Sequence, residues 1–226
     1  MNGSTLQEVW EEFRGVVLGR SGIADGIIPP LLFVLGNTVA GVGAGAVAGL
    51  GSAAAIIVWR LVRGRPLRFA LAGAGGTLLA VALAVRSGRA QDYFLPGIIG
   101  GTATVAIVAV SILARRPFVA WTSWITRGWP LAWYWHPRVR PAYARASWLW
   151  AVFFGVRTLV QWRLYLGGDS TSLAAIRVAS GWPALVLLLA ATYLLGRRWL
   201  TGLEGPSVEE FEAGAPPPWK GQQRGF

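Results

Sequence analysis

The stretch GIIPPLLFVLGNTVAGVGAGAVAGLGSAAAIIVW, residues 26–59, contains no charged side chain and decides the fold class of this chain. As one continuous helix its 34 residues would extend about 51 Å at 1.5 Å per residue, whereas the hydrocarbon core of a bilayer is about 30 Å thick. Two helices must therefore share the stretch. We expect membrane spans at residues 25–39 and 42–59, with the break between them around residues 37–43.

Further apolar runs of membrane length follow along the chain. Of its 226 residues, 54% are hydrophobic and 14% are charged, against about a quarter charged in an ordinary soluble domain. The sequence therefore predicts an all-α fold, a polytopic membrane helical bundle with six transmembrane helices. The remaining four spans are expected at residues 69–85, 93–114, 148–166 and 173–195.

The second span carries glycines at intervals of four, namely Gly41, Gly45 and Gly49. Residues four apart lie on one face of a helix, so this pattern removes side chains from that face and lets another helix approach closely. We favour close packing over a pore-lining role. A homo-oligomer through these glycines is one arrangement that the pattern allows.

Three segments outside the spans differ from them in character. Residues 5–18 carry apolar side chains at helical spacing, which predicts an amphipathic helix on the inner membrane surface. The tryptophans from Trp121 to Trp135 predict an interfacial segment, because tryptophan favours the headgroup level. The predicted domains are a cytoplasmic amphipathic segment (1–22), a six-helix transmembrane domain (23–198) and an acidic, proline-rich, disordered cytoplasmic tail (199–226).

The formal net charge of +11 is explained by topology rather than by a nucleic-acid partner. With the N-terminus inside, the cytoplasmic segments hold sixteen of the 21 lysines and arginines, the outer loops two and the spans three. Cytoplasmic loops of membrane proteins carry such an excess. We expect both termini in the cytoplasm and no binding to nucleic acid.

The residues available for chemistry are few. The chain has no cysteine and a single histidine, His136, so disulfides, thiolate metal sites and thiol nucleophiles are excluded. The spans hold no pair of carboxylates suited to acid and base catalysis. We predict a protein that is not an enzyme and that has no metal site and no cofactor.

The candidate functional residues are charged and polar side chains within or beside the expected spans, where placing such groups in lipid is energetically costly. Arg157 falls near the middle of the fifth span, and Gln161 lies one turn further on the same face. An arginine there should face protein or water and have a partner. One interpretation is an anion or lipid-phosphate site, because the guanidinium fork matches phosphate oxygens. The other is that these arginines reach toward headgroups and only stiffen the bundle.

Charged residues near the expected outer surface form the second candidate group. Arg163 and Arg177 are further candidates for binding an anion or a lipid, and they could also form an ion-pair cluster there with Asp92 and Asp169. Asp25 and Asp92 each stand four residues before a proline at the opening of a span, where a carboxylate can cap the first helical turn. The first of these spans is expected to begin on the inner side of the membrane and the fourth on the outer side. Two similar span openings of opposite direction are also what an inverted repeat, as found in many transporters, would produce.

Several segments resemble the intracellular septation protein A family of bacterial inner-membrane proteins. The run WAVFF at residues 150–154 is followed by Gln161 and by Ile-Arg-Val at 176–178, where the family has an Asn and a Phe-Lys-Val-Phe-Gly motif. The stretch ADGIIPPLLF at residues 24–33 and the step Arg-Arg-Pro-Phe at 115–118 agree more loosely. The chain is more similar still to an actinobacterial family of integral membrane proteins of unknown function.

The resemblance implies a multi-pass protein of the bacterial cytoplasmic membrane that acts in envelope maintenance or with the division machinery. Its partners would be membrane lipids and other envelope or division membrane proteins. The main hypothesis is thus a non-enzymatic envelope protein. The alternative is a small-solute transporter or lipid flippase with an anion or phosphate site around Arg157.

Overall fold

The computed structural model describes residues 23–64, 67–222 and 226, and over these residues it contains helices and no strand. The chain divides into two compact units, which we call unit 1 (residues 1–100 and 157–184) and unit 2 (residues 101–156 and 185–226). Three helices begin in one unit and end in the other: α4 (Leu95–Leu113), α7 (Arg140–Leu166) and α9 (Trp182–Gly202). Each unit is described by itself.

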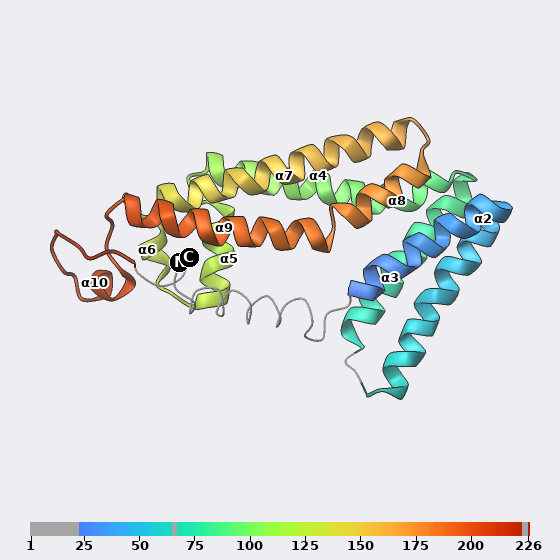
Figure 1. The fold of residues 1–226 in the computed structure, drawn as a ribbon, viewed down its shortest axis with the longest axis horizontal. Coiled ribbons are helices and arrows are strands. Elements are labelled where there is room, and N and C mark those ends of the chain that lie inside the picture. Colours follow the sequence, from blue (N-terminus) through green and yellow to red (C-terminus); the bar gives the residue numbers. More distant parts are fainter. Residues whose placement is uncertain (1–22, 65–66, 223–225) are drawn as a thin grey trace. The chain divides into compact units, whose positions relative to one another are not determined.

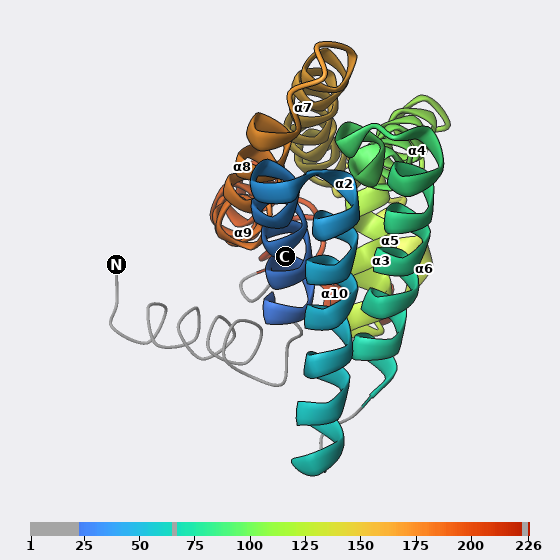
Figure 2. The ribbon, with the colours of Figure 1, turned by 90° about the vertical axis from the view of Figure 1, so that its right-hand side faces the viewer.

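Unit 1 is built around a helical hairpin. The helix α2 (Ile23–Val62) leaves helical geometry at Ala40 and Gly41, and its two halves run side by side in opposite directions (Figures 1 and 2). Gly41 has φ of 80°, a left-handed conformation that glycine adopts without strain. The break predicted around residues 37–43 is therefore confirmed.

Glycine allows the two halves of α2 to lie in backbone contact. A Cβ atom on Gly45 would lie 2.7 Å from the carbonyl oxygen of Phe33, and one on Gly36 would lie 2.7 Å from the carbonyl oxygen of Ala44. A Cβ atom on Gly49 would lie 3.4 Å from the Cβ atom of Phe33, at ordinary van der Waals distance. Gly45 and Gly49 thus pack within the chain, whereas Gly41 serves the turn. The homo-oligomer that this pattern allowed remains untested.

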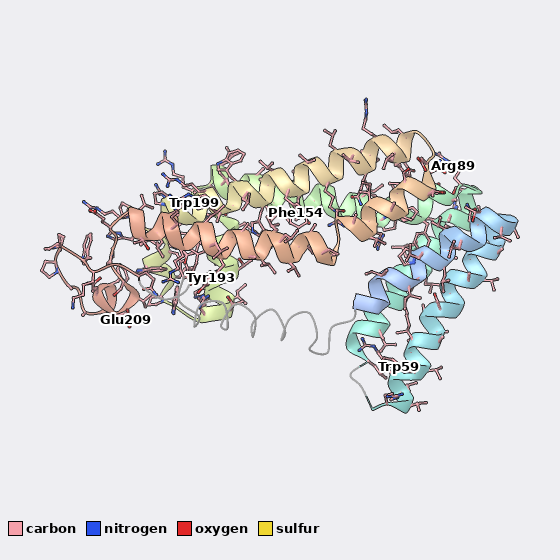
Figure 3. All side chains as sticks on the ribbon, in the orientation of Figure 1. Trp59, Arg89, Phe154, Tyr193, Trp199 and Glu209 are labelled. Carbon is pink, nitrogen blue, oxygen red and sulfur yellow. The ribbon has the colours of Figure 1, made fainter. Side chains whose placement is uncertain are left out.

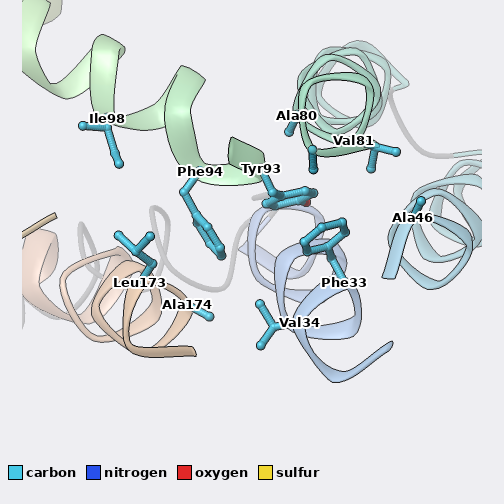
Figure 4. Packing of buried hydrophobic residues seen from close by; sticks show 11 residues of the cluster. Phe33, Val34, Ala46, Ala80, Val81, Tyr93, Phe94, Ile98, Leu173 and Ala174 are labelled. Atoms are coloured by element: carbon cyan, nitrogen blue, oxygen red, sulfur yellow. The ribbon is translucent and has the colours of Figure 1, made fainter. Parts of the chain in front are cut away.

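The rest of unit 1 closes a small apolar core over the hairpin. It comprises α3 (Arg68–Ser87), the short helix η1 (Ala90–Phe94), the start of α4, the end of α7 and α8 (Ser170–Ala179). Phe33 stacks on Tyr93 with ring centroids 4.2 Å apart, as Figure 4 shows. Alanines of α3 and Leu173 of α8 complete this core.

Unit 2 has an aromatic core. Besides parts of α4, α7 and α9 it contains α5 (Phe118–Arg127), α6 (Leu131–Tyr134) and α10 (Val208–Glu212). Trp133, Tyr134 and Tyr143 are fully buried, and Tyr193 and Trp199 of α9 (Figure 3) pack against the same cluster.

The tryptophans of the Trp-rich segment differ in their exposure, and the interfacial position of the segment stays a prediction. Trp121 and Trp124 of α5 are each 37% exposed, but the indole of Trp133 is buried in the core. A buried tryptophan needs an acceptor for its indole N–H. Trp133 has one, because its Nε1 donates to the Pro206 carbonyl at 2.9 Å. The composition of the segment does not reveal that acceptor, which lies 73 residues further along the chain.

The tail predicted to be disordered is instead folded over its described residues. Ser207 and Glu210 form a capping box that starts α10. The Val208 N–H donates to Gln222 Oε1 at 3.1 Å, and Phe226 is buried. The prediction failed because it weighed only the polar, proline-rich composition, whereas the aromatic cluster of unit 2 offers this tail an apolar surface.

Four described segments are long and apolar enough to cross a membrane: Ile27–Val62, Ala70–Ser87, Ala90–Leu113 and Ser170–Gly202. The first contains the predicted first two spans, which the kink in α2 separates. The expected fifth span forms the continuous helix α7, but four arginines lower the hydropathy of that helix. The expected sixth span is interrupted, because α8 ends at Ala179 and α9 begins at Trp182. The N-terminal segment 1–22 lies outside the described residues.

Candidate functional site

Unit 1 contains a cavity of about 270 Å³ beside α3. Small residues on one side of α3 leave this space, because alanine and glycine do not fill the distance to the neighbouring elements. Arg177 of α8 is the one charged residue among the described residues that line it. The lining consists of Pro30, Ala72, Gly73, Gly76, Thr77, Ala80, Tyr93 and Arg177.

Two hydroxyl groups accompany the guanidinium in the cavity wall. Thr77 and Tyr93 are both buried and line the same cavity as Arg177. A cation with two hydroxyls in apolar surroundings offers an oxyanion several hydrogen-bond donors and no competing carboxylate.

Gly97, at the start of α4, makes room for the guanidinium. A Cβ atom at Gly97 would lie 3.1 Å from Arg177 Nη1, closer than an ordinary van der Waals contact. The Arg177 guanidinium therefore packs against a glycine 80 residues earlier in the sequence.

Arg157 and Gln161, which the sequence placed at the centre of the site, do not line the cavity. Both lie on α7, and Gln161 is 6% exposed. The Nε of Arg157 is buried with no hydrogen-bond partner among the described residues, and the charges of Arg157 and Arg177 repel each other. Arg177, and not Arg157, therefore lines the cavity of unit 1, and an anion site around Arg157 stays a prediction.

Among the described residues, the partners found for both carboxylates of the predicted ion-pair cluster are groups other than Arg163 and Arg177. Asp92 accepts a hydrogen bond from the Tyr165 hydroxyl at 2.7 Å. Asp169 caps α8 by accepting from the Ser172 N–H at 2.9 Å, and hydrogen bonds from Ser172 hold the pKa of Asp169 below its usual value. Arg163 is exposed on α7.

Asp25 and Asp92 were both expected to cap the first helical turn of a span, and the structure describes the side chain of Asp92 alone. Asp92 lies inside η1 and bonds to Tyr165 instead of capping the helix. Asp25 lies in the first turn of α2, but its side chain is outside the described part of the structure.

Sequence reasoning missed Thr77 and Tyr93. The signal for Thr77 was a hydroxyl within a row of small residues, Gly73, Gly76 and Ala80, on one side of an uncharged span. For Tyr93 no local signal existed, because an aromatic residue at the start of a span is ordinary at a membrane interface. Among the described residues, no group of three or more histidines and acids could hold a metal ion.

Over the described residues the chain is helical, and four of its segments are long and apolar enough to cross a bilayer, which is consistent with an α-helical membrane protein. The chain belongs to the family described as Protein of unknown function (DUF3159), whose model matches residues 17–201. No curated protein and no solved structure matches it. The family match does not name septation protein A.

Proposed function

We propose that this protein is a multi-pass, non-enzymatic membrane protein that binds an anionic phosphate group in the Arg177 cavity. The group is carried either by a lipid headgroup or by a small free phosphate. The observation that supports the proposal is the Arg177 guanidinium in the wall of a 270 Å³ cavity whose other polar groups are hydroxyls.

Electrostatics favours an anion in this cavity. A guanidinium in apolar surroundings is costly unless a partner compensates its charge. The acids nearest in the predicted topology, Asp92 and Asp169, are engaged by Tyr165 and Ser172. Arginine presents a planar fork of N–H donors that matches two phosphate oxygens at once.

The volume of the cavity limits the size of the ligand. Sites for drug-sized molecules occupy about 300–1,000 Å³, so 270 Å³ suits a phosphate group and not a whole lipid. A lipid would place its phosphate in the cavity and leave its acyl chains outside.

The topology and cellular role are part of the same proposal. The distribution of basic residues supports six spans with both termini in the cytoplasm. The resemblance to septation protein A supports the bacterial cytoplasmic membrane and a role in envelope maintenance or division, with membrane proteins of the envelope as partners.

The binding proposal is tested by thermal unfolding of the purified protein with added inorganic phosphate, and in nanodiscs with or without an anionic phospholipid. A ligand present at 100 times its Kd stabilises the folded state by about 2.7 kcal/mol. We expect Arg177→Gln to abolish the stabilisation and Arg177→Lys to retain part of it. Arg163→Gln is the matched control, because Arg163 is exposed.

The response identifies the source of the phosphate. Stabilisation by inorganic phosphate alone indicates a free anion, and stabilisation only by anionic lipid indicates a headgroup. If Arg177→Gln and Arg163→Gln respond to both ligands as the unmodified protein does, the site is not at Arg177. Phosphate flux into liposomes that depends on Arg177 would favour the transporter alternative.

A further inference from the structure

A second candidate site lies in unit 2 and is filled by a side chain of the tail. Phe226 is 7% exposed, and its ring lies nearly parallel to that of Tyr143, with centroids 4.4 Å apart and planes at 8°. The backbone carbonyl of Phe226 accepts a hydrogen bond from Arg127 Nε at 3.0 Å. Figure 1 marks this end of the chain.

The pocket around the ring exists because α9 carries a glycine there. A Cβ atom on Gly196 would collide with the ring atoms of Phe226. Gly202, on the same helix, would meet nothing within 4 Å. Only one of these two glycines therefore makes room for an aromatic group.

The pocket wall contacts both the ring and the backbone carbonyl of Phe226. Besides stacking on Phe226, the Tyr143 ring contacts the rings of Trp133 and Tyr134 with centroids 6.1 and 5.0 Å away, so the aromatic core positions it independently of Phe226. The guanidinium of Arg127, which also lies 5.1 Å from the centre of the Trp129 ring, supplies a fixed donor for the carbonyl. An aromatic side chain next to a carbonyl acceptor satisfies both contacts.

The same tail is attached to unit 2 at a second place. Pro206 accepts from the buried Trp133 indole at 2.9 Å, and the ring of Trp219 meets that of His136 with centroids 5.4 Å apart. Occupation of the pocket by Phe226 therefore fixes the far end of a segment whose near end is already held.

We propose that Tyr143, Gly196 and Arg127 form a binding site for an aromatic side chain with an adjacent carbonyl, and that Phe226 of the same chain occupies it as a reversible latch on the tail. The latch is independent of the Arg177 cavity. Its occupant is intramolecular, and a short tether gives such an occupant an effective concentration in the millimolar range.

The latch is tested in the full chain by cleavage after Lys220, the single lysine of the sequence, with an endoproteinase specific for lysine, and is measured by mass spectrometry. Phe226→Ala removes the occupant and Gly196→Ala blocks the pocket. We expect each variant to accelerate cleavage about tenfold, a typical size for losing one stacked and hydrogen-bonded aromatic group. The double variant should be no faster than either single one, and Gly202→Ala should match the unmodified protein.

Two further measurements keep the test decisive if Gly196→Ala does not fold. Phe226→Leu keeps an apolar side chain without the ring and should give an intermediate rate. Acetyl-phenylalanine amide at several millimolar should accelerate cleavage of the unmodified protein and leave Phe226→Ala unchanged.

Three outcomes would overturn the proposal. Cleavage of Phe226→Ala at the unmodified rate would show that Phe226 does not hold the tail. Effects of Phe226→Ala and Gly196→Ala that multiply in the double variant would show that the two residues act separately. Protection that rises with protein concentration would assign the occupant to a second copy of the chain.

Discussion

The helical hairpin of α2 should depend on Gly45 and not on Gly43. A Cβ atom on Gly45 would lie 2.7 Å from the Phe33 carbonyl oxygen, whereas one on Gly43 would have nothing within 4 Å. Both substitutions by alanine gain up to about 1 kcal/mol of helix propensity. The difference between them therefore isolates the steric cost, which for overpacking of this kind is about 1–3 kcal/mol.

The measurement is thermal unfolding of both variants in the same detergent, followed by loss of helical circular dichroism. For a chain of this size, 1 kcal/mol shifts Tm by about 2–4 °C, so Gly45→Ala should melt roughly 2–12 °C below Gly43→Ala. Gly36→Ala should resemble Gly45→Ala, because its Cβ would lie 2.7 Å from the Ala44 carbonyl oxygen. Equal Tm values for Gly43→Ala and Gly45→Ala would refute the close contact between the two halves of α2.

Other contacts give predictions of known sign. Phe33→Ala, which removes the ring stacked on Tyr93, should lower the free energy of unfolding by about 3–5 kcal/mol, measured by chemical denaturation in detergent. Trp133→Phe leaves the buried Pro206 carbonyl without its donor and should cost about 1–3 kcal/mol, detected as faster amide exchange in the tail. Hydrogen bonds from the backbone N–H groups of Ser207, Lys220 and Gly221 lower the pKa of Glu210 from 4.5. The tail should therefore be fully stabilised by this carboxylate above pH 4.5 and lose that contribution as the pH falls further. Amide exchange in Glu210→Gln should lack this pH dependence.

The position of the break in α2 could be predicted because it follows from length. Residues 26–59 are too long for one span, and the glycines near the middle of the stretch mark where a turn is possible. The N-terminal start of α8 at Asp169 is also a local feature, since a carboxylate that accepts from a backbone N–H three residues later needs no distant partner.

The tail shows where composition misleads. Its prolines and acids suggest a disordered segment, but Pro206 receives the Trp133 indole N–H and Phe226 meets Tyr143. Both contacts join residues more than 70 positions apart in the chain. Hydropathy summed over a window does not include such pairs.

The sequence by itself determined that this chain is helical with several apolar segments of bilayer length, and that its longest apolar stretch breaks near the middle, because hydropathy and helix rise are local quantities that add along the chain. Only the tertiary structure decided that Arg177, and not Arg157, faces the cavity of unit 1. The direction of an arginine is set by the space its neighbours leave. Here that space comes from Gly97 and from the small residues of α3, which the fold brings to Arg177 from distant parts of the chain.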